Sequence, residues 1–514
     1  MTASLLSELP SVSSSDLRHW AACLALIYVI YKASRLYLRR KELQRTFSTF
    51  PGPPPHWLYG NSQEITVPGE GLDTVAGYAK QYEYGFPIWL GSFMAHLTIC
   101  HPDYAKAILT RQDPKDDFSY RFLTPWIGKG LLILSGPKWQ QHRRLLTPGF
   151  HYDVLKPYIN VMSDCANIML DKWEKIAANK RSVELFHDIS LMTLDTVMKC
   201  AFSYQSNCQL DSENEYIQAV YEISYLADAR FHFAPYHSDI IFNLSPQGFR
   251  FRRALRIAHE HTANVIKLRK ESLKKESELE KIKQKKHQDF LDILLCAKYE
   301  NGKGLSDEDL RAEVDTFMFA GHDTTATSLS WIFYCLAKHP EHQEKCREEI
   351  TEVLGDRNTV EWEDLSKMTY TTLCIKESMR LYPPVPGVAR ELKEPITFCD
   401  GRRLPKGAIV LLSIYAMNRC PSVWEDPEVF DPSRFSPENS SNRHPYAFIP
   451  FSAGARNCIG QNFAMNELKV VLALALRKFE LCPDPSCKPL KIPQIVLRSA
   501  NGVHINLKKI QKST

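Results

Sequence analysis

The chain has 514 residues, of which 44% are hydrophobic and 11% are aromatic. This is enough apolar material for a large core, so the composition excludes a disordered protein. The formal net charge is only +5, with 64 basic and 59 acidic residues, which argues against a dedicated nucleic-acid binder. The 14 cysteines include no C-x-x-C pair, so we expect neither a zinc site nor a disulfide framework, and a reducing compartment fits better.

The N-terminal segment passes from polar to apolar to basic residues. Residues 1–17 are polar and rich in serine, and we predict no structure for them. Residues 20–31 form an unbroken apolar run, and basic residues follow it. The run is shorter than the about 20 residues that cross a bilayer, but it becomes sufficient if Lys32 and Arg35 snorkel.

We therefore predict a signal-anchor helix over residues 18–41, with the remainder of the chain in the cytoplasm by the positive-inside rule. A cleaved signal peptide would carry its positive charge before the apolar run, and only Arg18 lies there. An interfacial helix and a soluble core helix are the remaining alternatives. Residues 42–60 contain Pro51-Gly52-Pro53-Pro54-Pro55, which predicts a semi-rigid hinge, with an SH3-type ligand as the alternative.

Further along the chain, short strand-like runs at residues 87–90 and 96–100 predict a small β-rich lobe. Residues 267–286 are dense in lysine and glutamate. We interpret them as a solvated helix end or surface linker, with a contact to anionic lipid as the alternative. A long helix is predicted from Ser306 to Lys338, because acidic residues at its start complement the helix dipole.

Inside that long helix lies the sequence Ala320-Gly321-His322-Asp323-Thr324-Thr325. Glycine and β-branched residues are unfavourable in a helix interior, so we predict a local opening that binds a ligand. The Thr324 hydroxyl could instead bond to the carbonyl one turn back. His322 does not share the face of Gly321 and Thr324, and we interpret it as structural.

One cysteine stands in a distinctive loop, Pro450 to Gln461. Glycines at 454 and 460 allow the backbone to turn tightly around a sulfur, and a helical pattern resumes at Phe463. A thiolate just before a helix is favoured by the helix dipole, and it is a soft ligand for iron. The alternative is that Cys458 is a buried structural cysteine.

The run from Phe451 to Gly460 matches Phe-x-x-Gly-x-Arg-x-Cys-x-Gly, and the chain is thereby identified as a member of the cytochrome P450 monooxygenases. The resemblance covers about residues 50 to 510. It implies a mainly α fold with a small β lobe, and residues 61–514 as the catalytic domain. It also implies a haem b whose iron binds Cys458, a ligand that favours O–O cleavage. Phe451 would shield the sulfur and Arg456 would reach a haem propionate.

The same resemblance assigns further residues. Trp139 and Arg143 share a helix face at i and i+4 and would bind a propionate, as would Arg390. Ala320 and Gly321 would cross the distal face of the haem. Asp323 and Thr324 would be catalytic, with Thr324 holding an ordered water and Asp323 relaying protons from solvent.

Two other groups of residues complete the predicted site. Glu377, Arg380 and Arg434 would form a buried structural triad that locks the segment bearing Cys458. The predicted substrate walls are Phe118, within the loop to Trp126, together with Phe317, Val385 and Val388. An Asn-Gly turn signal at residues 499–503 predicts a hairpin whose tip enters the pocket.

The run from Glu313 to Phe319 resembles family 4 of these enzymes, the fatty-acid ω-hydroxylases. Many members carry a glutamate at the position of Ala320, and its carboxylate forms an ester with a haem methyl group. Alanine has no carboxylate, so we expect a non-covalent haem.

The implied substrates are long-chain fatty acids or related lipids, hydroxylated or epoxidised after entry through a membrane-facing mouth. Electrons would come from NADPH through a flavoprotein reductase that contacts Arg144 and Lys469, with cytochrome b5 as a second donor. The implied location is the endoplasmic reticulum membrane, spanned once, with no nucleic-acid partner. A haem-thiolate isomerase of lipid hydroperoxides is a rival that would not need Asp323 and Thr324. A non-enzymatic haem sensor is the other rival.

Overall fold

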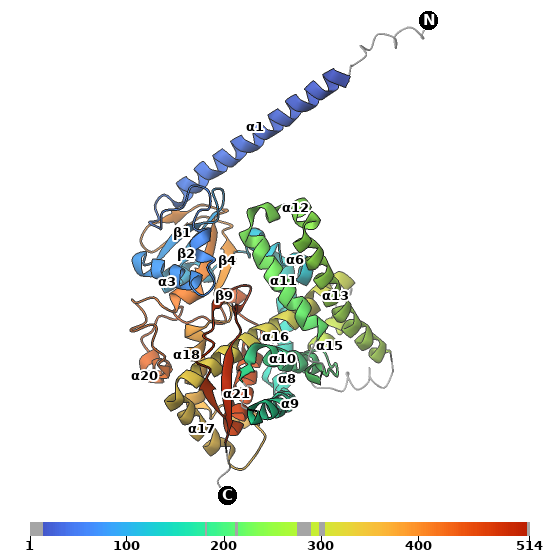
Figure 1. The fold of residues 1–514 in the computed structure, drawn as a ribbon, viewed down its shortest axis with the longest axis vertical. Coiled ribbons are helices and arrows are strands. Elements are labelled where there is room, and N and C mark those ends of the chain that lie inside the picture. The colour runs from blue at the N-terminus through green and yellow to red at the C-terminus, as the bar shows by residue number, and fades with distance from the viewer. Residues whose placement is uncertain (1–13, 180–181, 211–213, 275–288, 298–303, 511–514) are drawn as a thin grey trace.

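The computed structural model describes residues 14–179, 182–210, 214–274, 289–297 and 304–510. It is mainly helical with a small β lobe, which confirms the predicted fold class (Figure 1). Residues 1–13 of the predicted polar N-terminus lie outside the described residues, as do residues 275–286 of the lysine-rich segment.

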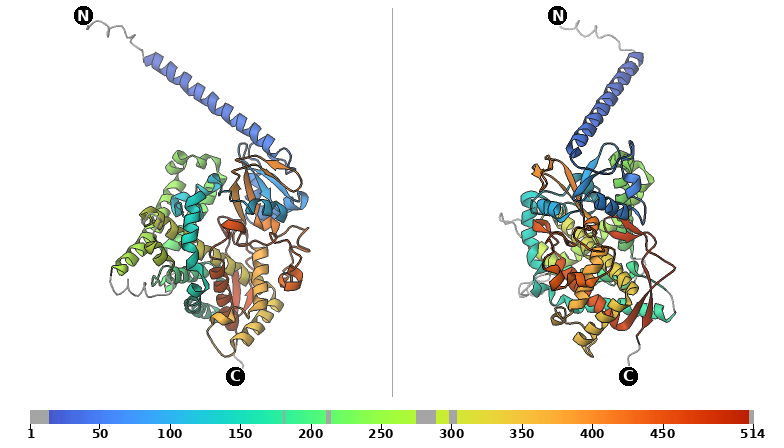
Figure 2. Two further views of the ribbon diagram at one scale, coloured as in Figure 1. Left: turned by 180° about the vertical axis from the view of Figure 1, so that it is seen from behind. Right: turned by 90° about the vertical axis from the view of Figure 1, so that its left-hand side faces the viewer.

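The first helix, α1, runs from Ser14 to Phe47, so it extends beyond both ends of the predicted anchor. Its 34 residues span about 51 Å. The helix stands away from the body in every view (Figure 2), and its apolar window within Leu17–Phe47 is long and apolar enough to cross a membrane and is 0% buried. The helix continues through residues 42–46 because helix-favouring Glu, Leu, Gln and Arg occur there. Phe47 and Phe50 are buried in the β lobe.

The β lobe is built on a four-stranded sheet in the order β1-β2-β7-β4. Strands β1 (Gly85–Trp89) and β2 (Ala95–Ile99) are antiparallel and confirm the two predicted strands. Strand β7 (Ile409–Ser413) pairs in parallel with β2 and antiparallel with β4 (Gly387–Glu391). Both β1 and β2 are buried along their whole length, because the sheet is covered on both faces.

The remaining elements form the helical body and three small sheets. The longer helices are α3 (Gly71–Gln81), α4 (Pro102–Leu109), α7 (Gly136–Leu146), α9 (Tyr158–Ala178), α10 (Leu185–Ala201), α11 (Glu215–His232), α13 (Pro246–Leu273), α16 (Asp307–Lys338), α17 (Pro340–Leu354), α18 (Thr369–Leu381) and α21 (Gln461–Lys478). The short helices are α2 (Ser62–Ile65), α5 (Asp117–Tyr120), α6 (Thr124–Ile127), α8 (Tyr152–Leu155), α12 (Asp239–Leu244), α15 (Phe290–Cys296), α19 (Ile414–Met417) and α20 (Pro437–Ser440). The other strands are β3 (Val183–Glu184), β5 (Ile396–Thr397), β6 (Arg403–Leu404), β8 (Phe479–Pro483), β9 (Lys491–Pro493), β10 (Leu497–Ser499) and β11 (His504–Lys509).

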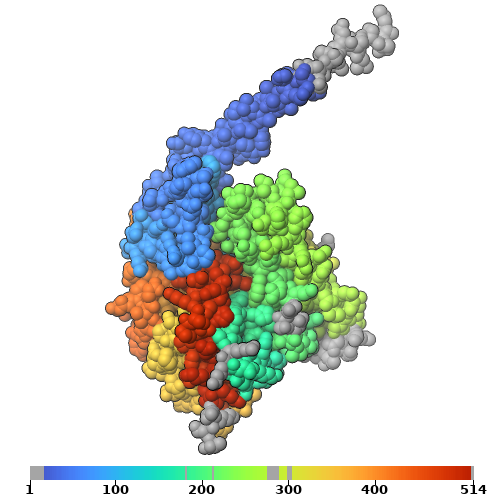
Figure 3. Space-filling view, in the orientation of Figure 1, coloured from blue at the N-terminus to red at the C-terminus, as the bar shows by residue number. Residues whose placement is uncertain are grey.

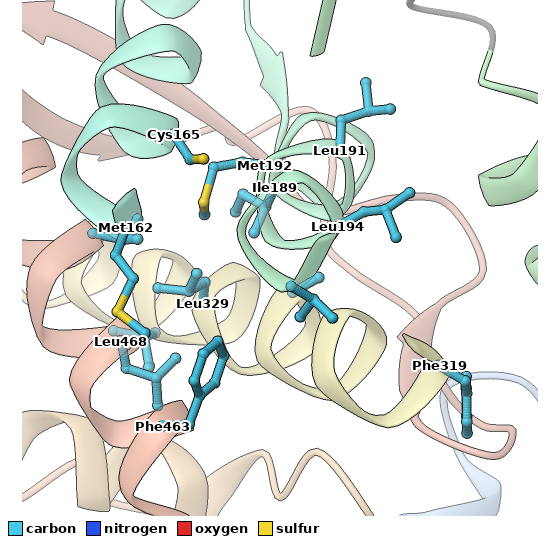
Figure 4. Close-up of a cluster of buried hydrophobic side chains, with 14 of the residues drawn as sticks. Met162, Cys165, Ile189, Leu191, Met192, Leu194, Phe319, Leu329, Phe463 and Leu468 are labelled. Carbon is cyan, nitrogen blue, oxygen red and sulfur yellow. The ribbon is translucent and has the colours of Figure 1, made fainter. Parts of the chain in front are cut away.

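Helix α16 is the centre of the helical body. It begins after Ser306, whose hydroxyl accepts a hydrogen bond from the main-chain nitrogen of Asp309 at 3.0 Å, and it ends at Lys338 as predicted. Helices α9, α10 and α21 surround it, and Figure 4 shows Met162, Ile189, Leu329 and Leu468 converging from the four helices.

The predicted local opening inside α16 is not observed, because the helix is continuous from Asp307 to Lys338. Two threonine hydroxyls bond within the helix instead. Thr324 donates to the Ala320 carbonyl at 2.7 Å, and Thr325 donates to the Gly321 carbonyl at 2.6 Å. These bonds satisfy the hydroxyls without opening the helix.

Candidate active site

A cavity of about 580 Å³ lies between α16 and the loop that carries Cys458. Ala320, Gly321 and Thr324 line it from the α16 side, and Phe451, Arg456 and Cys458 line it from the loop side. The fold therefore brings together two predicted motifs that are more than 130 residues apart in the sequence. The volume lies within the range of small-molecule sites.

The Cys458 loop is held in a single tight conformation. The main-chain nitrogen of Cys458 donates to the Phe451 carbonyl at 2.8 Å. Gly454 has a φ of +72°, and a Cβ atom there would lie 2.0 Å from the Leu109 carbonyl oxygen, so only glycine fits. Burial raises the pKa of the Cys458 thiol, while the Gly460 N–H and the Arg143 charge oppose that effect. An N–H donor and a positive charge beside the sulfur both stabilise the thiolate once a cation binds it.

Helix α7 connects this loop to α16. Arg143 donates to the main-chain oxygen and to the side-chain Oδ1 of Asn457, both at 2.8 Å. Its neighbour His142 lies 2.6 Å from Glu313 Oε1, and both side chains are fully buried. Glu313 Oε2 also accepts from the main-chain nitrogen of Leu131 at 3.0 Å. The positions of Trp139 and Arg143 on the cavity wall are therefore fixed from two sides.

Four basic side chains gather beside the cavity: Lys115, Arg143, Arg390 and Arg456. Within the described residues, none of them has an ion pair with a carboxylate. Burial and then the charge of Arg390 lower the pKa of Arg456 to about 10. The Nη2 atom of Arg456 is buried and has no hydrogen-bond partner among the described residues. The guanidinium itself lies 4.5 Å from the Trp139 ring.

This arrangement fits the expected haem. Like charges that are buried together are unfavourable unless anions neutralise them. A haem brings two propionates, and Arg143, Lys115 and Arg456, the last with its unpartnered Nη2, line the cavity that Cys458 also lines. The sequence expectation for Trp139, Arg143 and Arg456 is consistent with this geometry and stays a prediction. Arg390 is not among the residues that line the cavity, so its predicted contact with a propionate has no support from the lining.

Lys115 is a residue that the sequence reasoning missed. It lines the cavity, and its Nζ donates to the Tyr120 hydroxyl at 3.1 Å. Burial lowers the pKa of Lys115 well below its usual value, and Arg390 and Arg456 lower it further. The residue lies in Asp113-Pro114-Lys115-Asp116-Asp117, which reads as a charged surface loop, so no sequence signal indicated its place.

The two predicted catalytic residues face in different directions. Thr324 lines the cavity, although its hydroxyl bonds to the Ala320 carbonyl. Asp323 does not line the cavity. Its two carboxylate oxygens accept from Arg498 Nη2, each at 2.9 Å, and the carboxylate is fully buried. Arg498 was not predicted, although a single arginine directly after the apolar run Ile495-Val496-Leu497 is a visible signal. His322 is buried and also lies off the cavity, as expected.

The predicted triad is assembled, with Glu377 and Arg380 fully buried and Arg434 partly exposed. Arg380 Nε and Nη2 donate to the two carboxylate oxygens of Glu377, each at 2.7 Å, and both side chains are 0% exposed. Arg434 Nε lies 3.5 Å from Glu377 Oε1. Arg380 also donates to the carbonyls of Asn418 at 2.9 Å and Pro427 at 2.6 Å. The triad thus connects α18 to the segment that leads to Cys458.

Of the predicted substrate walls, Phe317, Val385 and Val388 line the cavity. Phe118 is not in the lining and packs behind it, with its ring 5.7 Å from Phe122. Other members of the same loop do form the wall, namely Ser119, Tyr120, Phe122 and Leu123.

The prediction for the Asn-Gly turn was wrong. Asn501 and Gly502 connect β10 to β11, which do not pair with each other. The tip that enters the cavity is the turn between β9 and β10, where Pro493, Gln494, Ile495 and Val496 line the wall. Asn501 is held elsewhere, because its Nδ2 donates to the Lys488 carbonyl at 2.9 Å.

A further unpredicted group is Glu467 on α21. Its carboxyl is 0% exposed, and neither oxygen has a hydrogen bond of good geometry among the described residues. Burial raises the pKa of Glu467 to about 8, although Thr196 and Thr325 oppose the shift. An acid on the apolar face of a helix pattern is a sequence signal that could have identified it.

Comparison with known proteins gives a consistent result. The family model described as Cytochrome P450 matches residues 50–506. Cytochrome P450 4A6 of Oryctolagus cuniculus is 56% identical over 500 residues, covering 97% of this chain and 98% of the relative. Cytochrome P450 4B1 of Rattus norvegicus and that of Homo sapiens are each 53% identical over 500 residues, with the same coverage of both chains.

Proposed function

The chain belongs to the cytochrome P450 family, and from that premise we propose that this haem-thiolate monooxygenase oxidises long-chain fatty acids or related lipids at a membrane surface. The observation that carries the proposal is the meeting of Cys458 and the Ala320–Thr324 face of α16 across one cavity. Haem b, the cofactor of the family, supplies dioxygen activation when it is bound, and Cys458 would hold its iron through the thiolate.

The chain's own residues then have separate tasks. Arg143, Arg456 and Lys115 face the cavity and would neutralise the two propionates. Thr324 would hold a water at the distal side by exchanging its bond to the Ala320 carbonyl. Asp323 would bring protons from the side of α16 that faces away from the cavity, where Arg498 holds its carboxylate.

The position of Ala320 bears on how the haem is held. Among the described residues of α16, no carboxylate lines the cavity. Glu313 is bonded to His142, and Asp315 accepts from Thr262 Oγ1 at 2.6 Å. Since Ala320 offers only a methyl group, we propose that the haem is bound through Cys458 and non-covalent contacts alone.

A lipid substrate fits the surface around the cavity. Several residues on and near α12 have exposed apolar side chains, namely Phe233, Ile240, Ile241 and Leu244. Helix α12 lies at the end of the body from which α1 leaves (Figure 1), and its green segment is on the visible face in Figure 3. Trp57, Leu58 and Tyr59 are exposed beside the start of the β lobe. With α1 in the membrane, these apolar groups would face the lipid surface, and a lipid could enter a cavity whose walls are mainly apolar.

We place the enzyme in the endoplasmic reticulum membrane with its catalytic domain in the cytoplasm, because the basic residues follow the apolar run. The redox partner of the family is a reductase. On the Cys458 side, Arg144 is exposed and available for such a contact. Lys469 is less available, because its Nζ donates to the Leu365 carbonyl at 2.7 Å. Cytochrome b5 would use the same basic side as a second electron donor.

The proposal is tested on the full chain reconstituted in vesicles with an NADPH-dependent flavoprotein reductase. We expect a red-shifted Soret band for the ferrous protein under carbon monoxide, and NADPH consumption coupled to oxidised fatty-acid products. If the folded ferrous protein under carbon monoxide lacked this red shift, the assignment of Cys458 as a thiolate ligand of the haem would be refuted. A red-shifted band with no product from any fatty acid, alcohol or hydrocarbon would remove the substrate class while keeping the haem site.

A further inference from the structure

A second polar region lies behind α16, on the side away from the large cavity. Tyr216 from α11, His261 from α13, and Asp315 and His322 from α16 meet there. The Tyr216 ring is tilted by 30° against the His261 ring with centroids 4.7 Å apart, and it lies 5.9 Å from the His322 ring. None of the four lines the large cavity. We refer to these four residues as the polar chamber.

The chamber contains several buried polar atoms that lack hydrogen-bond partners among the described residues. Tyr216 Oη, His261 Nε2, His322 Nε2 and Asp315 Oδ2 have no hydrogen bond among the described residues. Tyr216 is 3% exposed, Asp315 is 1% exposed and His322 is 0% exposed. Leaving one such atom unsatisfied costs about 1–3 kcal/mol, so four in one place indicate a bound polar ligand that the protein atoms do not supply.

The chemistry of these atoms matches water. His322 Nδ1 lies 2.7 Å from the Met318 carbonyl and must carry the hydrogen, because a carbonyl can only accept. His322 Nε2 is therefore an acceptor, and the Tyr216 hydroxyl is a donor. Burial lowers the pKa of His261 to about 4 and also lowers the pKa of His322, so both rings are neutral at neutral pH. Neutral donors and acceptors at several angles are the surroundings of buried water.

The chamber has an outer end near solvent. Asp315 Oδ1 accepts from Thr262 Oγ1 at 2.6 Å. Asp315 Oδ2 lies 3.9 Å from His259 Nε2 and 3.9 Å from Arg311 Nε. The Arg311 side chain is 46% exposed and the His259 side chain is 24% exposed, so bulk water reaches this end.

The inner end of the chamber reaches the motif on α16. His322 precedes Asp323, and Asp315 lies two turns earlier on the same helix. Burial raises the pKa of Tyr216 well above its usual value, and the charges of Asp315 and Asp323 raise it further. The carboxylate of Asp323 is in turn held by Arg498.

We propose that the polar chamber holds a chain of ordered waters that connects solvent at Arg311 and His259 to Asp323 and supplies protons for the monooxygenase reaction. The inference rests on the proposed function. Each proton that enters at the Asp315 end is matched by one that leaves toward Asp323, so no residue of the chamber changes its protonation over a full turnover. Tyr216 and His322 are positioning residues, because they act through water and do not contact the substrate.

The experiment uses the full-length holoenzyme with reductase. Tyr216→Phe removes one hydroxyl and keeps the ring. His322→Leu removes the acceptor, while His322→Gln keeps an acceptor of similar reach. Tyr104→Phe is the control, because Tyr104 is buried in the β lobe and its hydroxyl bonds to Asp400 at 2.7 Å. Product formed per NADPH is measured in H₂O and in D₂O, and a crystal structure of the wild-type holoenzyme shows whether the chamber contains water.

We expect ordered water within hydrogen-bond distance of Tyr216 Oη and His322 Nε2. We expect product per NADPH to fall about tenfold in Tyr216→Phe and His322→Leu, with a larger solvent isotope effect. This is less than the roughly 10²–10⁴-fold contribution of a direct acid or base, because both residues act through water. His322→Gln should recover most of the loss, and Tyr104→Phe should behave as wild type. A dry chamber would overturn the inference, as would wild-type coupling and isotope effects in both variants. Wild-type enzyme that forms no product refutes the proposed function instead, and the water structure still reports on the chamber.

Discussion

Arg143 of α7 donates to both the main-chain oxygen and the side-chain oxygen of Asn457, the residue that precedes Cys458, with both distances at 2.8 Å. One guanidinium thus fixes the backbone direction at the sulfur and presents a positive charge to the same cavity. Because α7 is itself fixed to α16 through His142 and Glu313, the two sides of the haem site are positioned by a single connected set of contacts.

Arg143→Met should therefore lose haem faster than wild type. A hydrogen bond to a charged group contributes about 1.5–3 kcal/mol, so the loss of this fork should speed haem release about tenfold or more. The measurement is the rate of haem transfer to an excess of an apo-haem protein. Arg144→Met is the matched control, because Arg144 is exposed and its haem release should match wild type. Equal release rates for the two variants would contradict a role for Arg143 in holding the haem.

Removing one partner of the Glu377–Arg380 pair should destabilise the whole protein. Both side chains are 0% exposed, and breaking a buried pair leaves an uncompensated charge that costs about 3–5 kcal/mol. We expect Glu377→Gln and Arg380→Met to give little folded, haem-containing protein, as measured by the thermal unfolding midpoint and by haem per chain.

Arg434→Lys provides the comparison for that pair. Its side chain is 11% exposed and lies 3.5 Å from Glu377, so a lysine can retain part of the charge interaction. This variant should fold with a smaller loss of stability. If Arg380→Met unfolded at the wild-type temperature, the structural role of the triad would be refuted.

The haem of the wild-type enzyme should be released completely by acid extraction, because Ala320 faces the cavity without a carboxylate. Ala320→Glu restores the side chain that the resemblance associates with an ester, so after turnover part of its haem should remain on the denatured chain. Ala320→Gln has a similar size and no carboxylate, and it should release its haem. The measurement is haem absorbance that co-elutes with the polypeptide under denaturing conditions, and wild-type haem that co-elutes would refute the non-covalent assignment.

The sequence was most informative where local chemistry and regular periodicity coincide. The capped helix from Ser306 to Lys338 was predicted at both ends, because an N-cap and an acidic first turn define its start. The tight turn around Cys458 could be predicted from its glycines, because a close backbone approach at Gly454 excludes any side chain. Fold class and cofactor followed from that one loop.

Features that depend on three-dimensional packing could not be predicted from the sequence. Lys115 becomes a cavity residue only because the loop after α4 folds inward beside Arg390 and Arg456. The Asn-Gly turn at 501–502 has the sequence of a hairpin, but pairing of β10 with β9 and of β11 with β8 places the tip at residues 493–496 instead. Turn propensity cannot specify which strands pair over a distance, because the pairing is decided by burial.

The stability of the protein should depend on pH through Glu467. This carboxyl is fully buried, and burial raises its pKa to about 8 from a model-compound value of 4.5. Below the unfolded pKa both states hold the proton and Glu467 has no effect. Between the two pKa values the unfolded chain releases a proton that the folded chain retains, so the free energy of unfolding falls as pH rises. Over three pH units between these two pKa values, the free energy of unfolding falls by about 4 kcal/mol.

Glu467→Gln removes that dependence while keeping the size of the side chain. The denaturant midpoints of wild type and Glu467→Gln should therefore lie closest at pH 5 and diverge steadily up to pH 8, with the variant the more stable at the higher pH. Taking the difference between the two proteins cancels the titration of other buried acids such as Asp315, whose pKa burial raises to about 7. A difference that stays constant from pH 5 to pH 8 would mean that Glu467 is ionised in the folded protein, held by Thr196 and Thr325 or by a cation that reaches it between α10, α16 and α21.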